Sequence, residues 1–110
     1  MEFLTKLEEL VLIAVLKLKG EAYSVSIYNF VVNITGKDVS VSSVYFPLER
    51  LVRKGYLQCF QSDPTPKRGG MSKRHYRLTR SGYKALEENR SLSQTVWKGV
   101  GPLLKNTPES

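Results

Sequence analysis

The fold of this chain is decided by the stretch Ser40-Val41-Ser42-Ser43-Val44-Tyr45-Phe46-Pro47-Leu48-Glu49-Arg50-Leu51-Val52-Arg53-Lys54-Gly55-Tyr56-Leu57. At 100° per residue, an α-helix over this stretch has an apolar side made of Val41, Val44, Leu48 and Leu51. Its other side carries hydroxyl, aromatic and guanidinium groups from Ser42, Ser43, Phe46, Arg50 and Arg53. The sequence therefore predicts a helix from about Val41 to Lys54 that packs on a core and offers a face suited to a DNA groove. A surface helix with a few solvated arginines is the alternative.

Pro47 conflicts with this helix, because inside a helix proline removes a backbone donor and crowds the carbonyl four residues earlier, at a cost of about 3 kcal/mol. That carbonyl belongs to Ser43. We interpret Pro47 as a tolerated kink that sets the angle of the first two turns. A break that shortens the helix is the alternative.

The net charge of +7 is concentrated in one part of the chain. Residues 50–80 contain nine Lys and Arg and one acidic residue, for a net charge of +8, whereas residues 1–49 carry four basic and six acidic residues. A local basic field attracts polyanions and gives affinity through counterion release. Its position beside the predicted helix favours nucleic acid as the partner.

The preceding segment predicts two further helices. Thr5 and Glu8 have the spacing of a capping box, which opens a helix from about 5 to 19 with Gly20 as its stop. A short link at Ala22-Tyr23, with room for a single strand pairing, leads to a second helix capped by Ser24 or Ser26 and ended by Thr35-Gly36. Helix, turn and exposed polar helix in this order are typical of a helix-turn-helix.

The segment after the central helix predicts a β-hairpin. Leu57 to Ser62 alternates apolar and polar residues, residues 63–70 contain two prolines and two glycines, and Lys73 to Leu78 forms the return strand. Tyr76 and Leu78 share one face, whereas His75 and Arg77 share the other, where we expect His75 to face DNA or solvent. The basic tip suits phosphates or the minor groove, and its cations are Lys67, Arg68, Lys73 and Arg74.

Thr79 can cap a last helix from about Arg80 to Lys98, which Gly101-Pro102 then breaks. A β-hairpin directly after the second helix of a helix-turn-helix is the wing of a winged helix-turn-helix domain. The last helix lies beyond this domain and needs a partner against which to bury Trp97. A second copy of the chain is the simplest partner. The expected interface residues are Leu7, Val11, Tyr83, Leu86, Val96, Trp97 and Val100.

At 110 residues the chain is one small unit, with an expected winged domain over 1–79, a dimerisation helix over 80–105 and a flexible tail over 106–110. The fold class is α+β, mainly helical.

The composition also excludes several kinds of site. A lone Cys59 and a lone His75 exclude a disulfide framework and a zinc site of recognisable spacing, and no cofactor is expected. Charges interrupt the apolar N-terminal run, so we expect a cytoplasmic protein without a membrane partner. No nucleophile, base or phosphate loop has the spacing of an enzyme.

Two blocks of residues resemble the PadR-like transcriptional regulators, over about Leu4 to Leu86. The first block contains Ser43-Val44-Tyr45, Leu48, Arg50-Leu51 and Gly55-Tyr56-Leu57. The second contains Gly70, Lys73-Arg74, Tyr76-Arg77-Leu78-Thr79 and Gly82. In this family the proline usually follows the tyrosine directly, whereas here Phe46 separates Tyr45 from Pro47. Met71 stands where a basic residue is common, and His75 where an aromatic is common.

The resemblance implies a homodimeric winged helix-turn-helix that binds operator DNA, usually as a repressor on a pseudo-palindrome, with a single C-terminal helix in the dimer interface. By the resemblance Ser43 and Tyr45 would contact the DNA backbone, and Lys73 and Arg74 would lie on the wing. Together with the analysis above, the candidate DNA-binding residues are Ser40, Ser42, Ser43, Tyr45, Phe46, Arg50, Arg53, Lys67, Arg68, Lys73 and Arg74.

Two alternatives stay open at this point. Small relatives can hold an apolar effector between subunits, so Trp97 is a candidate for such a pocket, although a Trp packed in the dimer core is the favoured explanation. A winged helix can also serve as a protein interaction module without specific DNA binding, here through Phe46 and the wing.

Overall fold

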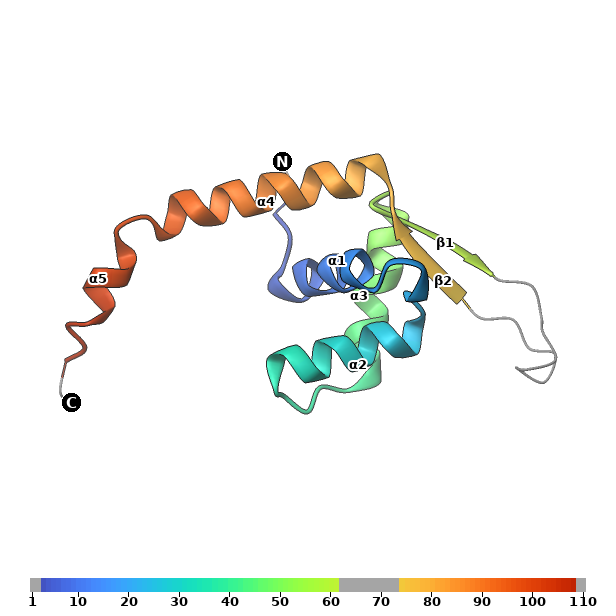
Figure 1. Ribbon diagram of the computed structural model, residues 1–110, viewed down its shortest axis with the longest axis horizontal. Coiled ribbons are helices and arrows are strands. Elements are labelled where there is room, and N and C mark those ends of the chain that lie inside the picture. Colours follow the sequence, from blue (N-terminus) through green and yellow to red (C-terminus); the bar gives the residue numbers. More distant parts are fainter. Residues whose placement is uncertain (1–2, 62–73, 109–110) are drawn as a thin grey trace.

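The computed structural model describes residues 3–61 and 74–108. In chain order its elements are α1 (Lys6–Leu18), a 3-10 turn η1 (Lys19–Glu21), α2 (Ser24–Thr35), α3 (Val41–Arg53), β1 (Leu57–Gln61), β2 (Arg74–Leu78), α4 (Arg80–Trp97) and α5 (Val100–Leu104). Helices α1, α2 and α3 form a compact group, and the hairpin extends from one side of it; α4 runs from the end of β2 across the top of α1 and projects with α5 on the other side (Figure 1). This is the predicted winged helix, in a mainly helical chain.

The C-terminal arm, residues 91–108, makes the molecule elongated. The Cα radius of gyration is 16.9 Å and the principal extents are 59 × 31 × 20 Å. A compact domain of this length would have a radius of gyration of about 13 Å. The end of α4 and all of α5 project from the packed body (Figure 1).

Helix α1 begins with the predicted capping box. The Glu8 N–H donates to Thr5 Oγ1 at 3.0 Å, and the Thr5 N–H donates to Glu8 Oε1 at 2.9 Å. The predicted stop at Gly20 is wrong, because Lys19 takes the positive φ of 55° and Gly20 lies in η1. The chain turns one residue earlier than the glycine suggests.

Neither predicted serine occupies the N-cap position of α2, although Ser26 takes part in its capping box. Tyr23 occupies the N-cap position, and Ser24 is the first helical residue. Ser26 acts from inside the helix, where its Oγ accepts the Tyr23 N–H at 2.8 Å. The predicted end at Gly36 is confirmed by its left-handed φ of 65°.

Helix α3 runs unbroken through Pro47, so the alternative of a shortened helix is excluded. Ser40 caps it by accepting the Ser43 N–H at 3.3 Å. Val44, Leu48 and Leu51 are buried as predicted, whereas Val41 is 48% exposed. The assignment of Val41 to the core stripe is therefore wrong, because this first residue of the helix lies outside the packed cluster.

The wing is an antiparallel pair in which Leu57 lies opposite Leu78 and Gln61 opposite Arg74. Tyr23 forms an isolated bridge with His75, and the Tyr76 N–H donates to the Ala22 carbonyl at 2.9 Å. The link before α2 therefore makes the single strand pairing that the sequence allows. Lys67, Arg68, Met71 and Lys73 lie outside the described residues.

The predicted break at Gly101-Pro102 is wrong. Helix α4 ends at Trp97, Gly99 has a left-handed φ of 79°, and α5 starts at Val100 and includes Pro102. Proline is tolerated there because the first N–H groups of a helix have no partner within the helix. The flexible glycine breaks the helix, two residues before the position that the sequence suggested.

The core joins α1, α2, α3 and the sheet into one cluster. Its buried apolar residues are Val11, Leu12, Ala14, Val15, Ala22, Ile27, Val31, Val44, Leu48, Leu51, Leu57 and Tyr76. Because α3 contributes three of them, the core fixes one side of this helix and leaves the opposite side exposed.

Candidate nucleic-acid interface

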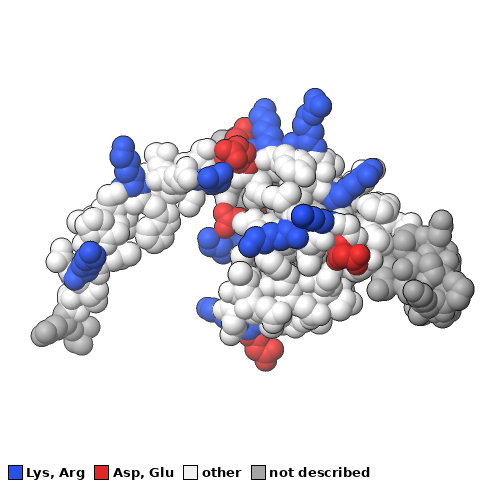
Figure 2. Space-filling view, in the orientation of Figure 1, with Lys and Arg blue, Asp and Glu red and all other residues white. Residues whose placement is uncertain are grey.

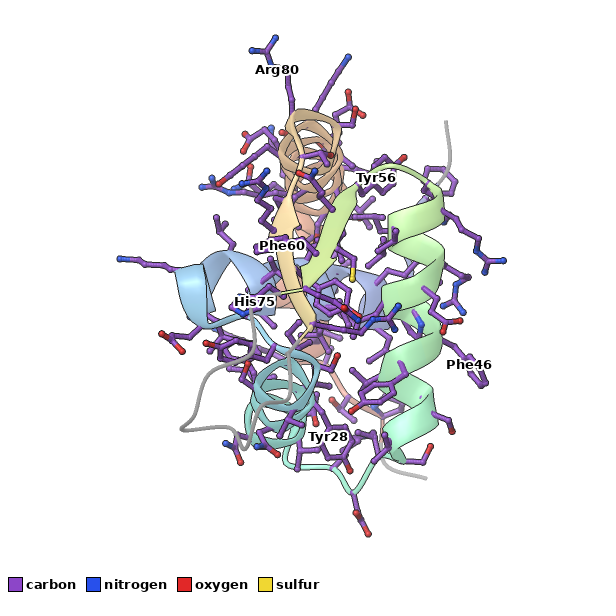
Figure 3. All side chains as sticks on the ribbon, turned by 90° about the vertical axis from the view of Figure 1, so that its right-hand side faces the viewer. Tyr28, Phe46, Tyr56, Phe60, His75 and Arg80 are labelled. Atoms are coloured by element: carbon purple, nitrogen blue, oxygen red, sulfur yellow. The ribbon has the colours of Figure 1, made fainter. Side chains whose placement is uncertain are left out.

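The open side of α3 is a single stripe of exposed residues. Ser42, Phe46, Glu49 and Arg53 are all exposed and follow at steps of four, three and four, which places them on one helical face. Phe46 is 61% exposed and points away from the body of the protein (Figure 3). Sequence reasoning missed Glu49, although its spacing from Phe46 and Arg53 indicates the same face.

The head of α3 carries a group of hydroxyls. Ser40 Oγ lies 2.7 Å from Ser43 Oγ and 3.3 Å from Ser42 Oγ. Tyr45 and Ser43 are partly buried, so they border the exposed stripe rather than form it. Hydroxyls and free N–H groups at a helix N-terminus are suitable donors for phosphate oxygens.

Arg50 lies away from this stripe. Its Nε is 3.6 Å from Oε2 of Glu8, a residue that is 1% exposed, and Lys54 Nζ approaches the same oxygen at 3.1 Å. Burial raises the pKa of Glu8, but the Thr5 hydrogen bond and the charges of Lys54 and Arg50 outweigh it and hold the pKa below its ordinary value. Arg50 therefore helps to attach α3 to α1.

Sequence reasoning missed this buried cluster of Glu8 and Lys54. A pattern in the sequence could have revealed it. Glu8 stands four residues after Leu4, three before Val11 and four before Leu12, so it falls on the same helical face as these apolar residues. A carboxylate inside such an apolar stripe needs a cationic partner when the helix packs.

Arg74 of the wing and Arg53 of α3 line the same groove. Arg74 is exposed at the end of β2, and it lines a groove of about 320 Å³ together with Arg53, Glu49 and Cys59. The structure thus brings together one predicted residue of α3 and one of the wing. Of the predicted wing cations, Arg74 lies within the part of the chain that the structure describes.

The predicted subunit face lies mainly on α4. Trp97 is 57% exposed, Tyr83 and Val96 are also exposed, and Leu7, Leu86 and Val100 are half-buried. Val11 is 0% exposed, so its assignment to the interface is wrong: it is enclosed by the core of its own chain.

The arm itself has little charge. Residues 91–108 contain two lysines and no acidic residue, and the surface of the arm is mostly uncharged (Figure 2). Between α1 and α4 runs a groove of about 530 Å³, lined among others by Ile13, Leu16, Tyr83, Leu86 and Trp97.

Comparison with known proteins agrees with this geometry. A model of the transcriptional regulator PadR-like family matches residues 12–88, which is more than half of the chain. The chain belongs to the PadR-like family. It is a DNA-binding transcriptional regulator rather than an enzyme, as members of this family are.

Solved structures of similar fold include a PadR-like regulator from Bacillus cereus, with a TM-score of 0.75 and 21% identity over 92% of this chain and 93% of that one. A PadR family regulator from Clostridium difficile has a TM-score of 0.67 and 19% identity over 93% and 97%. One from Eggerthella lenta has a TM-score of 0.68 and 23% identity over 89% and 83%. None of the curated proteins compared matches the chain significantly.

In this PadR-like regulator His75 is a packing residue, so the expectation that it faces DNA or solvent is wrong. Its ring centroid lies 4.4 Å from that of Tyr23 in an edge-to-face contact and 5.2 Å from that of Phe60 in a stack. Its Nε2 is buried without a hydrogen bond. The aromatic neighbours explain how histidine replaces the aromatic residue common in the family.

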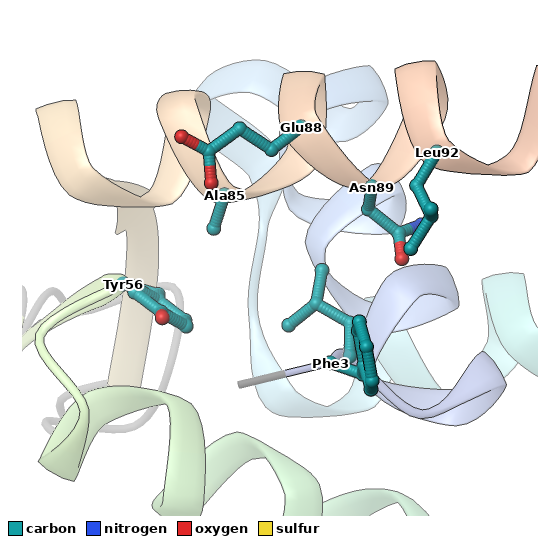
Figure 4. A pocket seen from close by; sticks show the side chains of 7 residues that line it. Phe3, Tyr56, Ala85, Glu88, Asn89 and Leu92 are labelled. Atoms are coloured by element: carbon teal, nitrogen blue, oxygen red, sulfur yellow. The ribbon is translucent and has the colours of Figure 1, made fainter. Parts of the chain in front are cut away.

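A second hollow of about 340 Å³ lies on another side of α4, between this helix, the N-terminal residues and Tyr56 (Figure 4). Its lining includes Phe3, Leu4 and Leu92. Asn89 also lines it, and the Asn89 amide donates to the Glu9 carboxylate of α1. This contact helps to hold α4 on the body.

Within residues 3–61 and 74–108, no helix has the length and hydropathy needed to cross a bilayer. The same residues contain no group of three or more His, Cys, Asp or Glu side chains placed to hold a metal ion.

Proposed function

We propose that this PadR-like regulator binds a pseudo-palindromic operator as a homodimer and represses transcription. In each half-site, α3 would enter the major groove and the wing would contact the flanking backbone. The half-sites would lie about one helical turn, roughly 10 bp, apart. The observation that carries this proposal is the groove shared by Arg53 of α3 and Arg74 of the wing, beside an exposed helix face.

The weakly charged segment 91–108 and the exposed apolar side chains of α4 support the dimeric part of the proposal. An exposed Trp97, an exposed Tyr83 and a half-buried Leu86 line one groove, next to a segment with almost no charge. A two-fold pair of such faces would bury them mutually. The winged domain over 1–79 would then bind DNA and the helical segment over 80–105 would join the subunits. A small apolar effector would bind beside Trp97 in the same groove.

The experiment is a duplex-binding titration at several salt concentrations. The full-length protein should bind a duplex from its own promoter region that contains an inverted repeat, with an affinity that falls as salt rises. Replacing Arg53 or Arg74 by alanine should weaken binding and lower the salt slope by about one for each lost phosphate contact. An unchanged slope after both replacements, together with Lys67→Ala and Arg68→Ala, would contradict the proposal.

A second candidate function is a protein interaction module, which the 61% exposure of Phe46 favours. Such a module would retrieve genomic DNA without a shared motif and would co-purify with a defined protein partner. Retrieval of DNA fragments that share an inverted repeat would exclude it.

A further inference from the structure

The exposed stripe of α3 has an unusual order of side chains for a surface that meets a polyanion. Along the helix come a hydroxyl (Ser42), an aromatic ring (Phe46), a carboxylate (Glu49) and only then a guanidinium (Arg53). Among the described residues no cation lies within 4.0 Å of the Glu49 carboxylate. The middle of the stripe thus offers an unpaired negative charge and an apolar ring.

Neither group suits a phosphate. A carboxylate facing the backbone would be repelled, and a ring 61% exposed to water gains nothing from a phosphate oxygen. The floor of the major groove offers matching partners for both. There thymine presents its C5-methyl group, an apolar contact for Phe, and cytosine presents its N4 amine, a donor for Glu.

We propose that Phe46 packs on the 5-methyl group of a thymine and that Glu49 accepts a hydrogen bond from the N4 amine of a cytosine in the same half-site. The inference rests on the proposed binding of operator DNA by α3. It names the bases that this helix selects.

The spacing of the two side chains fits neighbouring bases. Three residues of an α-helix rise about 4.5 Å along its axis, and successive bases of one strand are about 3.4 Å apart. Phe46 and Glu49, three residues apart on one face, therefore reach adjacent base pairs. Arg53, one turn further on, would lie near the groove edge and its phosphates.

The test starts with selection of duplexes by the full-length protein from a random double-stranded pool. In the selected duplex each thymine is then replaced by deoxyuridine, which removes only the methyl group. Loss of one buried methyl corresponds to about 0.8 kcal/mol, or roughly a fourfold weaker Kd. We expect this roughly fourfold increase in Kd when one particular thymine of a half-site is replaced. Replacing the equivalent thymine in both half-sites should raise the Kd roughly fifteenfold.

The variants assign the contact to a residue. Phe46→Ala should bind the thymine and uracil duplexes with equal affinity, and Ile34→Ala, which truncates an exposed apolar side chain of α2, should retain the fourfold preference. Glu49→Ala should keep the thymine preference, lose the cytosine preference at the adjacent pair and bind unrelated duplexes more tightly, because a negative charge has been removed.

Several outcomes would overturn the inference. Equal wild-type affinity for thymine and uracil at every position would do so alone, while leaving operator binding intact. A thymine preference that survives in Phe46→Ala, or an unchanged base preference in Glu49→Ala, would also contradict it. Absence of salt-dependent binding to any selected duplex would instead overturn the proposed function, and this inference with it.

Discussion

The Oε2 atom of Glu8, in the first turn of α1, lies 3.1 Å from the Nζ atom of Lys54 at the end of α3. The two residues are 46 positions apart in the chain, and the carboxylate is 1% exposed. A charge buried to this extent is tolerated only when it is paired and hydrogen-bonded. Glu8 therefore fixes α3 relative to α1 as well as capping its own helix.

Replacing this carboxylate by its neutral isostere should destabilise the fold. Glu8→Gln retains an acceptor for the Thr5 N–H but removes the buried negative charge that Lys54 and Arg50 approach. Removal of one partner from a fully buried pair costs about 3–5 kcal/mol. Because Lys54 and Arg50 are 25% and 40% exposed and can be rehydrated, we expect about 2 kcal/mol here. Urea unfolding at neutral pH measures the difference, and Glu87→Gln on the exposed face of α4 is the control.

The same contact predicts a dependence on pH. A carboxyl whose pKa is lowered on folding stabilises the folded state above its unfolded pKa, which is 4.5 for Glu8. That stability is lost as the pH falls through the folded pKa. The difference in unfolding free energy between wild type and Glu8→Gln should therefore be constant near neutrality and shrink below about pH 4.5. A difference that does not change between pH 7 and pH 3 would contradict the assignment.

The two arginines of α3 should behave differently. Arg53 is exposed at the groove that Arg74 shares, so Arg53→Ala should weaken DNA binding and lower the salt slope by about one, with little effect on stability. Arg50 approaches Glu8, so Arg50→Ala should lower stability by about 1 kcal/mol. Thermal melts and binding at two salt concentrations separate the two effects. Equal loss of DNA affinity without loss of stability in both variants would refute this division.

A close contact at Gly82 gives a prediction about packing. A Cβ at this position of α4 would lie 2.1 Å from the carbonyl oxygen of Tyr56. That carbonyl already accepts the Thr79 N–H at 3.1 Å and has little freedom to move. Gly82→Ala should therefore destabilise the protein by about 3 kcal/mol, at the upper end of overpacking effects. Gly101→Ala in α5, where no atom lies within 4 Å, should leave the melting temperature nearly unchanged.

Trp97 offers a direct measurement of the proposed dimer, because it is the only Trp in the chain. It is 57% exposed in one chain, so burial against a second copy should shift its fluorescence emission to shorter wavelength as the concentration rises.

Truncation of the same side chain tests its part in the dimer. Trp97→Ala should raise the dimer dissociation constant at least tenfold in sedimentation equilibrium, since truncation of a central aromatic commonly costs about 2 kcal/mol or more. Val25→Ala, which shortens another exposed side chain, should not. A monomeric wild type at all concentrations would exclude this role.

Local patterns predicted many of the elements for identifiable reasons. The Thr5 and Glu8 spacing marks a capping box that forms as predicted, and the step from Val44 to Leu48 and Leu51 marks the buried side of α3. Both depend on contacts within four residues along the chain. Predictions about helix ends failed at Lys19 and Gly99, because a single glycine suggests a stop without fixing which residue takes the positive φ.

The sequence by itself determined the order of helices and strands, the basic segment and the family, since hydrophobic periodicity, charge and short motifs are local properties. Only the tertiary structure decided which polar residues of α3 remain available for recognition. The helical wheel groups Arg50 with Arg53, but α1 supplies a buried carboxylate that attracts Arg50 and Lys54, while Phe46, Glu49 and Arg53 stay exposed. Packing likewise encloses Val11 and places the His75 ring against Tyr23 and Phe60, because burial and ring contacts depend on how the elements pack in space.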